Sequence, residues 1–221
     1  MKKKIAIVAG GDSSEVVVSL KSAKGLESFI DGNKYEKYIV TIVGKEWNVQ
    51  LSETEKIAID KNDFSFVKNG QKITFDFAYI TIHGTPGENG ILQGYFDLIG
   101  LPYSCCGVLA AAMTFNKFTC NQYLKGFGVS IAESIVFRKN QTIASAEVVK
   151  KVELRCFSKP NVGGSSFGVT KVKEESQIQS AIAKAFAEGD QVIIESFMQG
   201  TEITCGVYKT KDKQVAFPIT E

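Results

Sequence analysis

Apolar runs alternate with segments of helical apolar spacing along the first hundred residues, and this alternation constrains the fold more than any other feature. The run from Lys4 to Ala9 predicts a buried strand, and apolar residues between Val16 and Ile30 recur at helical spacing. Residues 38–43 predict the next strand. Strands that alternate with helices are typical of a mainly parallel sheet, so we expect an α/β fold.

A hairpin and a polar glycine loop follow in the same half of the chain. Asn69 and Gly70 separate two apolar segments, and both residues tolerate the positive φ of a tight hairpin turn. The next expected elements are a strand at residues 77–82, the loop His83 to Gly90 and a helix through Ile91 and Leu98.

From about Leu109 the pattern changes, and a second domain is expected. We place the domains at residues 1–112 and 113–221. The second contains predicted helices at residues 109–113, 115–124, 144–152 and 174–188, and predicted strands at 131–137, 154–159, 169–172, 192–197, 203–208 and 215–217. The last strand ends at Glu221 with no closing helix after it, so we expect a domain that is cut short.

Charge and hydropathy exclude several classes of protein. The 26 basic and 24 acidic residues leave a formal net charge of +2, which does not provide the basic surface of a duplex-binding protein. Lys2 to Lys4 resemble the start of a signal peptide, but Gly10 and Gly11 interrupt the apolar run after them. No apolar run of membrane-spanning length occurs, so we expect a cytoplasmic protein with neither nucleic-acid nor membrane partners.

The five cysteines do not form a recognisable framework. Cys105, Cys106, Cys120, Cys156 and Cys205 are odd in number and contain no C-x-x-C pair. A disulfide-rich domain needs regular spacing in a short secreted chain, and a zinc site needs paired ligands. We therefore expect buried, reduced thiols and no metal site among the residues present.

The segment from Lys159 to Gly168 is the most distinctive motif. Its glycines permit close approach of the backbone to an anion, and Ser165, Ser166 and Lys159 add further donors. The order differs from a Walker loop, and no H-R-D sequence accompanies it, which excludes a protein kinase. A phosphate-binding loop and an ordinary β-hairpin with a flexible tip remain as alternatives.

Two carboxylates lie around the end of the strand at residues 192–197. Glu195 is suited to accept a hydrogen bond from an adenine amine. The Met198 backbone could bond the edge of the adenine ring, and Glu202 could bind the ribose hydroxyls. The alternative is that these are only solvated acids at the end of a strand.

Three further positions carry possible chemistry, each with a plain structural alternative. Asp12 and Glu15 match a capping box for the first helix, and Glu15 also lies at the carboxyl edge of the first strand, where it could bind an ammonium group. His83 begins a glycine-rich loop at the carboxyl end of the predicted strand 77–82, although a lone histidine is more often structural. Lys117 on a predicted helix is by itself a surface charge.

Taken in order, these segments resemble the D-alanine–D-alanine ligase family of the ATP-grasp superfamily. The matching segments are residues 10–15 with 18–20, 83–94, 100–103, 116–117, 159–168 and 195–202. The resemblance implies an N-terminal Rossmann-like (pre-ATP-grasp) parallel-sheet domain that binds D-alanine, followed by the first α+β subdomain of an incomplete ATP-grasp domain. Asn89, Asn116 and Ser196 depart from the residues common in the family.

The resemblance also implies roles for individual residues. Glu15 would bind the ammonium of the first D-alanine, Val18 and Ser19 would line its pocket, and His83 would lie near the reacting carboxylate. Lys117 and Lys159 would hold ATP phosphates, and Ser165 and Ser166 would belong to the loop that closes over the substrates. Glu195, Met198 and Glu202 would read adenine and ribose. We count Glu15, His83 and Ser165 as the expected catalytic set.

The implied activity is an ATP-dependent joining of two D-alanines through an acyl phosphate, for peptidoglycan precursor synthesis. The implied cofactors are ATP and Mg²⁺, with metal ligands and an arginine expected in a C-terminal segment that this chain lacks, so we expect little turnover from the chain alone. A homodimer through the N-terminal domain is also implied. The alternatives are a D-alanine–D-lactate or D-alanine–D-serine ligase, and a nucleotide-binding ATP-grasp module without catalysis.

Overall fold

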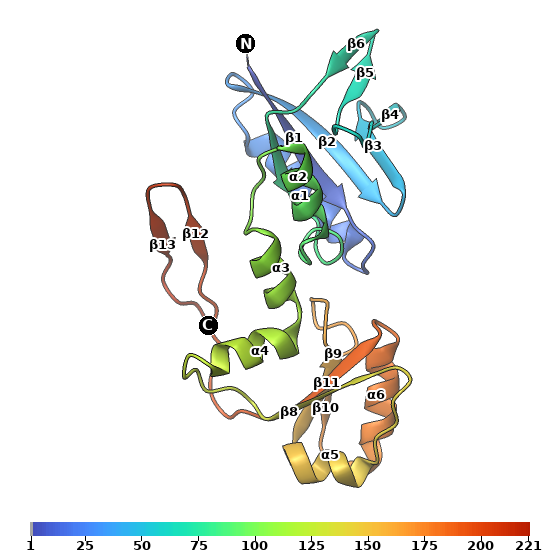
Figure 1. Ribbon diagram of the computed structural model, residues 1–221, viewed down its shortest axis with the longest axis vertical. Helices are drawn as coiled ribbons and strands as arrows, with labels where there is room; N and C mark the ends of the chain where they lie inside the picture. Colours follow the sequence, from blue (N-terminus) through green and yellow to red (C-terminus); the bar gives the residue numbers. More distant parts are fainter. Residues whose placement is uncertain (1) are drawn as a thin grey trace.

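The computed structural model describes residues 2–221, which form two larger sheets, of five and four strands, and two two-stranded hairpins. Figure 1 shows the first sheet at one end of the molecule, the second at the other, and the helices α3 (Val108–Phe115) and α4 (Lys117–Lys125) between them. Near the chain end, a hairpin of β12 (Val207–Lys209) and β13 (Gln214–Ala216) stands away from both sheets.

The first sheet has the strand order β4-β3-β2-β1-β7. Its centre is parallel, as expected, because α1 crosses from β1 to β2 and both β2 and β7 run parallel to β1. The bounds are β1 (Lys3–Gly10), α1 (Val16–Phe29), β2 (Tyr35–Val43), β3 (Glu46–Gln50), β4 (Lys56–Ala58) and β7 (Phe77–Ile80).

The sheet is mixed rather than parallel throughout. Strands β3 and β4 pair antiparallel at one edge, and the sequence analysis did not predict either of them. The strand β3 is mostly polar and β4 has only three residues, so neither shows a clear apolar alternation. Pairing of β3 with β2 and of β4 with β3, rather than their own pattern, defines them as strands.

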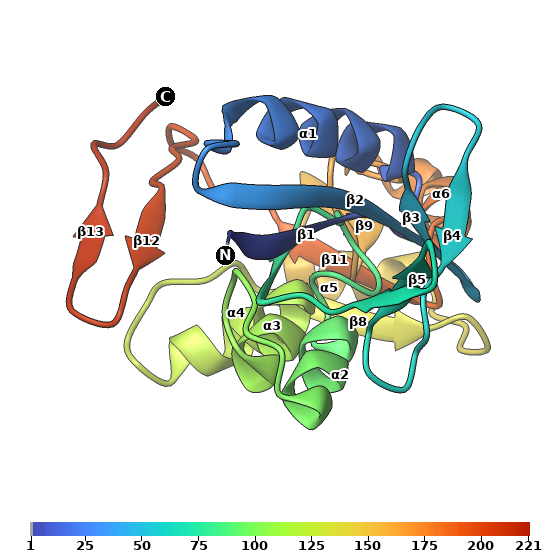
Figure 2. The same cartoon turned by 90° about the horizontal axis from the view of Figure 1, so that it is seen from above.

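Alternate residues of β1 serve two different cores. Ile5, Ile7 and Ala9 pack with Ala23 of α1, whereas Ala6 and Val8 belong to the larger cluster with Leu92 and Phe96 of α2 (Ile91–Ile99). Successive side chains of a strand point to opposite faces, which explains the division. Figure 2 shows α1 on one side of β1 and β2 and α2 on the other.

A small aromatic layer extends the larger core. The rings of Phe64 and Phe96 lie 5.0 Å apart in an edge-to-face arrangement, and Phe66 stacks on Phe75 at 5.8 Å. The predicted hairpin at Asn69 and Gly70 is confirmed. It joins β5 (Phe66–Lys68) to β6 (Gln71–Ile73), and the two turn residues have φ of 51° and 76°.

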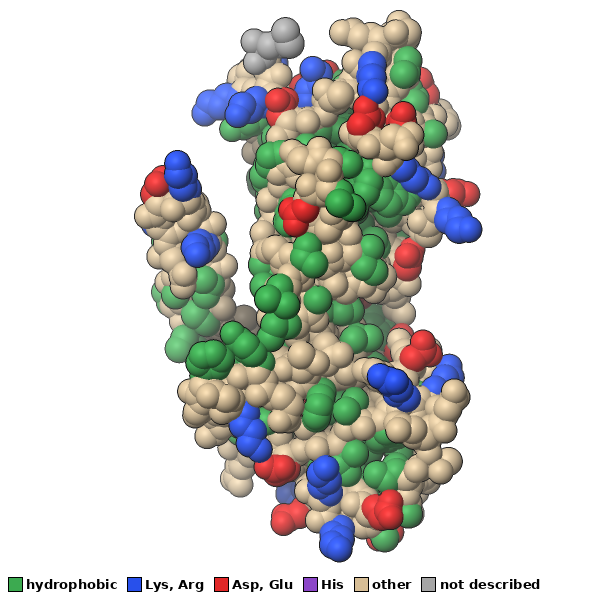
Figure 3. Space-filling model, viewed as in Figure 1, with side chains coloured by type: hydrophobic (Ala, Val, Ile, Leu, Met, Phe, Trp, Pro, Cys, Tyr) green, Lys and Arg blue, Asp and Glu red, His purple; other side chains and the backbone are tan. Residues whose placement is uncertain are grey.

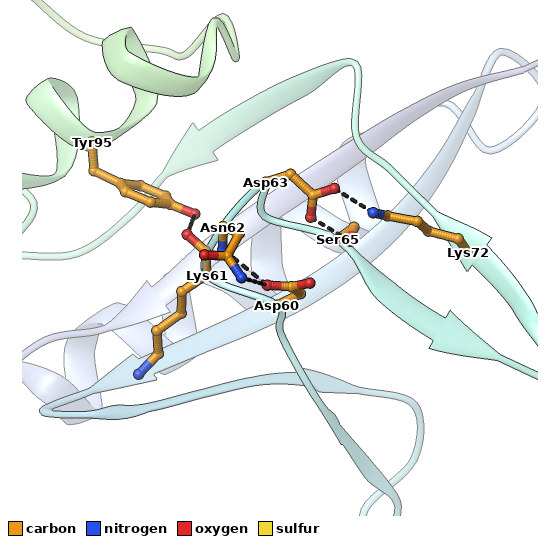
Figure 4. A network of polar contacts seen from close by, with 7 residues as sticks. All are labelled: Asp60, Lys61, Asn62, Asp63, Ser65, Lys72 and Tyr95. Carbon is orange, nitrogen blue, oxygen red and sulfur yellow. Dashed lines mark hydrogen bonds and ion pairs between the residues drawn. The ribbon is translucent and has the colours of Figure 1, made fainter.

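Polar contacts hold the loop before β5 against α2 (Figure 4). The Asp60 carboxylate accepts bonds from the Asn62 backbone and side chain at 2.9 and 2.8 Å, and the Tyr95 hydroxyl donates to the Lys61 carbonyl at 2.9 Å. Asp63 pairs with Lys72 at 2.5 Å, but both side chains are well exposed, so this pair contributes little stability. The network is structural and positions α2.

The second sheet has α5 and α6 on one face. Its strands are antiparallel in the order β10-β9-β11-β8, and α5 and α6 pack on Val192 and Ile194 of β11. The bounds are β8 (Ser134–Arg138), α5 (Ser145–Val152), β9 (Cys156–Pro160), β10 (Thr170–Val172), the short 3₁₀ turn η1 (Glu175–Gln177), α6 (Ile178–Phe186) and β11 (Gln191–Ser196). Lys159 and Glu195 alternate with the core residues and therefore lie on the other face.

Two sequence expectations are wrong. The helix α1 starts at Val16 with Glu15 at its N-cap and no side-chain cap bond, while Asp12 accepts a bond from the Gly44 amide at 2.6 Å. The capping box therefore does not form, because the Asp12 carboxylate bonds the turn between β2 and β3 instead.

All five cysteines are free, as expected, but only Cys156 is buried, and Cys105, Cys106 and Cys205 are exposed. Among residues 2–221, no helix is long and apolar enough to cross a membrane.

Two leucines on α2 provide a matched test of the larger core. Leu92 is 1% exposed and Leu98 is 88% exposed. We expect Leu92→Ala to lower the free energy of unfolding by about 2–5 kcal/mol, because it leaves a cavity in the core. Leu98→Ala should change it by less than about 0.5 kcal/mol. Urea unfolding followed by circular dichroism measures both, and equal losses would contradict the assignment of the core.

Candidate functional site

A cleft of about 760 Å³ lies between the two sheets. The loop after β1, the loop after β7 and the start of α4 form one side, and the loop between β9 and β10 forms the other. The residues that line it include Asp12, Ser13, Ser14, Glu15, Gly84, Thr85, Phe115, Lys117, Phe157, Lys159, Gly163, Gly164, Ser165, Ser166, Phe167, Glu188 and Glu202. Two of these loops follow the carboxyl ends of parallel strands, where α/β sheets bind ligands.

The β9–β10 loop has an unusual backbone. Gly163, Ser165 and Ser166 have φ of 107°, 47° and 58°. Serine in this left-handed region is uncommon, and such residues cluster at functional sites. The loop therefore joins two antiparallel strands, as the hairpin alternative expects, but its conformation is specific rather than that of an ordinary turn.

Asn161 fastens this loop to α4. The side chain is 1% exposed, accepts a bond from the Phe118 amide at 2.9 Å and donates to Gln191 at 2.8 Å. Its carbonyl accepts from the Lys117 amide at 2.9 Å. Buried amide groups with all these partners hold the loop and the first turn of α4 in a fixed relation.

Glu15, which lies between β1 and α1, contacts the β9–β10 loop. The side chain is 6% exposed, and Ser165 Oγ donates a hydrogen bond to Glu15 Oε1. A Cβ atom added at Gly164 would lie 3.1 Å from Glu15 Oε2, so a larger residue there would crowd the carboxylate. The small loop residues thus allow direct contact between two segments that are far apart in the sequence.

Lys117 and Lys159 bring two positive charges into the cleft. Lys117 Nζ donates to the Gly163 carbonyl at 2.8 Å, and no ion pair among residues 2–221 includes this amine. Burial lowers the pKa of Lys117, and the neighbouring charge of Lys159 lowers it further. An amine held by a neutral carbonyl beside a second lysine is an environment that an anion would stabilise.

Lys159 is instead neutralised within the second sheet. It forms an ion pair with Glu195, whose side chain is 9% exposed, and Asn121 of α4 donates to the other carboxylate oxygen at 2.9 Å. Residues 117 and 121 are four apart on α4, so both face the site. Asn121 and Glu195 therefore fix the position of the Lys159 side chain.

The structure brings together some of the residues expected from the sequence and separates others. Glu15, Lys117, Lys159, Ser165, Ser166 and Glu202 line the cleft. Five others are not among the lining residues: Val18, Ser19, His83, Glu195 and Met198. Among these, Val18 is 49% exposed, and Ser19 is fully buried with its hydroxyl accepting a bond from the Gly10 amide.

The positions of His83, Glu195 and Met198 relative to the cleft differ. His83 is half-buried directly before the lining residues Gly84 and Thr85, and its carbonyl accepts a bond from Ser13 Oγ at 2.9 Å. Glu195 reaches the cleft only through Lys159, and Met198 is 57% exposed beyond the end of β11.

Sequence reasoning missed Asn161, Asn121 and Glu188. Asn161 lies inside the glycine-rich motif and could have been found there, and Asn121 lies one helical turn after Lys117. The Ser14 hydroxyl donates to Glu188 at 3.2 Å, a contact between the two sheets that has no local sequence signal.

No metal centre is formed by the part of the chain that the structure describes. Among residues 2–221, no three His, Cys, Asp or Glu side chains come close enough to hold a metal ion. The lysine and hydroxyl donors in the cleft suit an anion, and the Glu15 carboxylate is an acceptor that suits an ammonium group. These residues do not by themselves assemble the set of carboxylates that Mg²⁺ prefers.

Comparison with known proteins gives consistent matches along the chain. The family model described as D-ala D-ala ligase N-terminus matches residues 4–106, and the one described as D-ala D-ala ligase C-terminus matches residues 123–221. A D-alanine--D-alanine ligase from Phocaeicola vulgatus is 68% identical over 221 residues, which are 100% of this chain and 68% of that relative.

Solved structures match as well. The VanG D-Ala:D-Ser ligase from Enterococcus faecalis has a TM-score of 0.84 at 28% identity, covering 99% of this chain and 69% of that chain. A D-alanine--D-alanine ligase from Bacillus anthracis, complexed with ATP, has a TM-score of 0.73 at 28% identity, covering 98% of this chain and 66% of that chain. These likenesses confirm the expected fold class.

The Lys159–Glu195 pair can be tested by its contribution to stability. We expect Lys159→Met to destabilise the chain by about 3 kcal/mol, because it leaves the Glu195 carboxylate buried without its partner. Adding Glu195→Gln should recover a large part of this loss. A double-mutant cycle measured by urea unfolding provides the values, and strictly additive effects would show that the pair is not coupled.

Proposed function

Because the chain belongs to the D-alanine–D-alanine ligase family, we propose that its cleft binds the first D-alanine and the phosphates of ATP for the joining of two D-alanines. Two curated relatives that carry this name are 68% and 64% identical to the chain over 221 residues, and the chain spans 68% of the length of each. Glu15 is the proposed ammonium ligand, and Lys117 and Lys159 are the proposed phosphate ligands.

One observation carries the nucleotide part of this proposal: Lys117 has a lowered pKa, a neutral carbonyl partner and a second lysine beside it. The free energy of such an arrangement falls when a polyanion enters. The β9–β10 loop adds hydroxyl groups from Ser165 and Ser166 and exposed backbone at Gly163 and Gly164. A cleft of about 760 Å³ is within the usual range for small-molecule sites.

The proposed chemistry assigns a task to each side of the cleft. A carboxylate is a poor electrophile, and ATP supplies the phosphoryl group that activates it. Lys117 and Lys159 hold and neutralise the phosphates, since phosphoryl transfer is mainly a matter of positioning and charge. Glu15 orients the amino acid, and its bond to Ser165 brings the loop over it. His83 remains a proposed neighbour of the reacting carboxylate, with Val18 and Ser19 supporting the pocket from α1.

The proposed nucleoside end lies along β11. Glu195 is the proposed acceptor for the adenine amine, with the Met198 backbone and Glu202 for the ring edge and the ribose. Glu195 already bonds Asn121 and Lys159, but a carboxylate has four lone-pair sites and retains capacity for another donor. Mg²⁺ stays a proposed cofactor whose ligands the described residues do not assemble.

Two further proposals concern organisation. We propose residues 1–112 and 113–221 as the domains, since the core clusters of the first sheet use residues 5–103 and that of the second sheet uses residues 135–194. We also keep a homodimer through the first domain. Exposed apolar side chains there, such as Phe29 at 86% and Ile91 at 61%, support it. Sedimentation velocity measures the oligomeric state.

The choice of second substrate separates the candidate functions. A curated relative at 68% identity is named for D-alanine, whereas the D-Ala:D-Ser ligase structure is 28% identical. We therefore favour D-alanine. A nucleotide-binding module without catalysis would bind ATP but would not respond to D-alanine, so the two ligands must be tested separately.

The lysines are tested by ATP binding. We expect Lys117→Ala and Lys159→Ala each to weaken binding about tenfold or more, because each removes a charge-assisted contact to phosphate. Lys24→Ala, an exposed lysine on α1, is the matched control and should leave binding unchanged. Titration calorimetry with ATP measures all three, and an unchanged affinity in both cleft variants would reject the phosphate site.

The pH dependence of ATP binding follows from the lowered pKa of Lys117, whose ordinary value is 10.5. As pH rises, this amine loses its proton earlier than an ordinary lysine, so ATP affinity should begin to fall at a lower pH than the titration of an ordinary lysine would cause. Lys117→Arg keeps its charge throughout and should flatten the profile. An identical fall in the arginine variant would show that another group is responsible.

Glu15 is tested by D-alanine binding. We expect Glu15→Gln to abolish binding of D-alanine, measured by saturation-transfer NMR with L-alanine as the control ligand, while ATP affinity stays within about twofold, because only the ammonium partner is lost. Glu188→Gln, another acid of the cleft, is the matched control. Retained D-alanine binding in Glu15→Gln would reject the ammonium site.

Turnover is tested separately. We expect these 221 residues to show little of it, and an assay of phosphate release in the presence of ATP, Mg²⁺ and D-alanine measures it.

A further inference from the structure

Cys105 and Cys106 are adjacent exposed thiols that the proposed ligase function does not use. They lie between α2 and α3, outside the residues that line the cleft. Cys105 has a φ of 86°, an unusual value for a residue with a Cβ atom. Its backbone is therefore held in a conformation that most loop residues avoid.

A buried amide holds one of the two thiols in place. Gln93 is 1% exposed, and its Nε2 donates to Cys105 Sγ at 3.3 Å and to the Gly87 carbonyl at 2.5 Å. The Gln93 Oε1 atom is buried without a partner among the described residues. The bond from this buried amide fixes the Cys105 thiol and distinguishes it from a cysteine on a mobile loop.

The two thiols stand on adjacent residues of one loop and affect each other electrostatically. Burial raises the pKa of Cys105, the bond from Gln93 opposes this, and the Cys106 charge adds to the increase. The charges of both thiols also contribute to the raised pKa of Tyr103. The thiols therefore share one local environment.

The geometry of neighbouring residues favours a bridging atom over a direct disulfide. Their peptide bond is trans, so their Cα atoms lie about 3.8 Å apart, below the usual disulfide range of about 4.4–6.8 Å. A bridging atom enlarges the ring and relieves this strain. No third ligand from His, Cys, Asp or Glu joins the pair within residues 2–221, so the bridge must need only two protein sulfurs.

We propose that Cys105 and Cys106 form a dithiol site for trivalent organoarsenicals, in which arsenic bridges both sulfurs and keeps its own carbon substituent. With phenylarsine oxide, two S–H bonds break, two As–S bonds form and the oxygen leaves as water. Arsenic remains trivalent, so the reaction requires no oxidant. This site is independent of ligase activity.

The test is intact-mass spectrometry of the chain after incubation with phenylarsine oxide and excess 2-mercaptoethanol. We expect one phenylarsine group per chain that resists the monothiol and is removed by 2,3-dimercaptopropanol. Cys105→Ser and Cys106→Ser should each weaken binding about a hundredfold or more, because the second bond becomes intermolecular. Cys205→Ser, which removes a separate exposed thiol, should bind as the parent does.

Cys105→Gly is a second variant, because glycine accepts the positive φ and keeps the loop folded. It should lose binding as Cys105→Ser does, while circular dichroism remains unchanged. Monothiol-resistant binding that survives in either Cys105 variant or in Cys106→Ser would overturn the proposal. Loss of binding in Cys205→Ser, or no resistant adduct on the parent chain, would overturn it as well.

Discussion

The contact between Glu15 and the β9–β10 loop joins the two sheets, and the arrangement of the cleft depends on it. Glu15 is nearly buried, although a lone carboxylate loses much hydration free energy on burial. The hydroxyl of Ser165 provides a partner, and Gly164 permits the close approach. Asn161 then connects the same loop to α4, so one segment positions both the acidic and the basic side of the cleft.

The second sheet explains why the basic groups are available. The helices α5 and α6 cover one face, and the strand period places Lys159 and Glu195 on the other, where Asn121 of α4 contacts Glu195. Figure 3 shows apolar side chains gathered over α4 and the base of the β12–β13 hairpin. Tyr123 of α4, Phe127 just after α4 and Val207 of β12 are each more than half exposed, at 53%, 71% and 58%. The second sheet therefore buries its apolar residues under α5 and α6 and directs Lys159 and Glu195 toward α4.

Sequence patterns predicted well where burial acts along one element. The helix at residues 16–29 and the turn at Asn69 and Gly70 were predicted because apolar period and positive φ are local properties. Strands β3 and β4 were missed because pairing defines them, of β3 with β2 and of β4 with β3. The capping box failed because Asp12 finds a partner at Gly44, which is distant in the sequence. The cysteines were expected in the core, but an apolar neighbourhood in sequence does not determine which side of a loop faces solvent.

The sequence by itself determined most of the order of elements, the α/β class and the glycine-serine loop between two strands, since each depends on neighbouring residues. It also supplied Glu15 and Lys159 as candidates, through a strand end and a motif, whereas Lys117 was a candidate only through the family resemblance. Only the tertiary structure decided that these three residues share a cleft, that Lys159 pairs with Glu195, and that the Ser19 hydroxyl accepts a bond from the Gly10 amide. The cleft brings together Glu15 and Lys159, which are 144 residues apart in the sequence. Such proximity follows from how whole sheets pack, which no local pattern encodes.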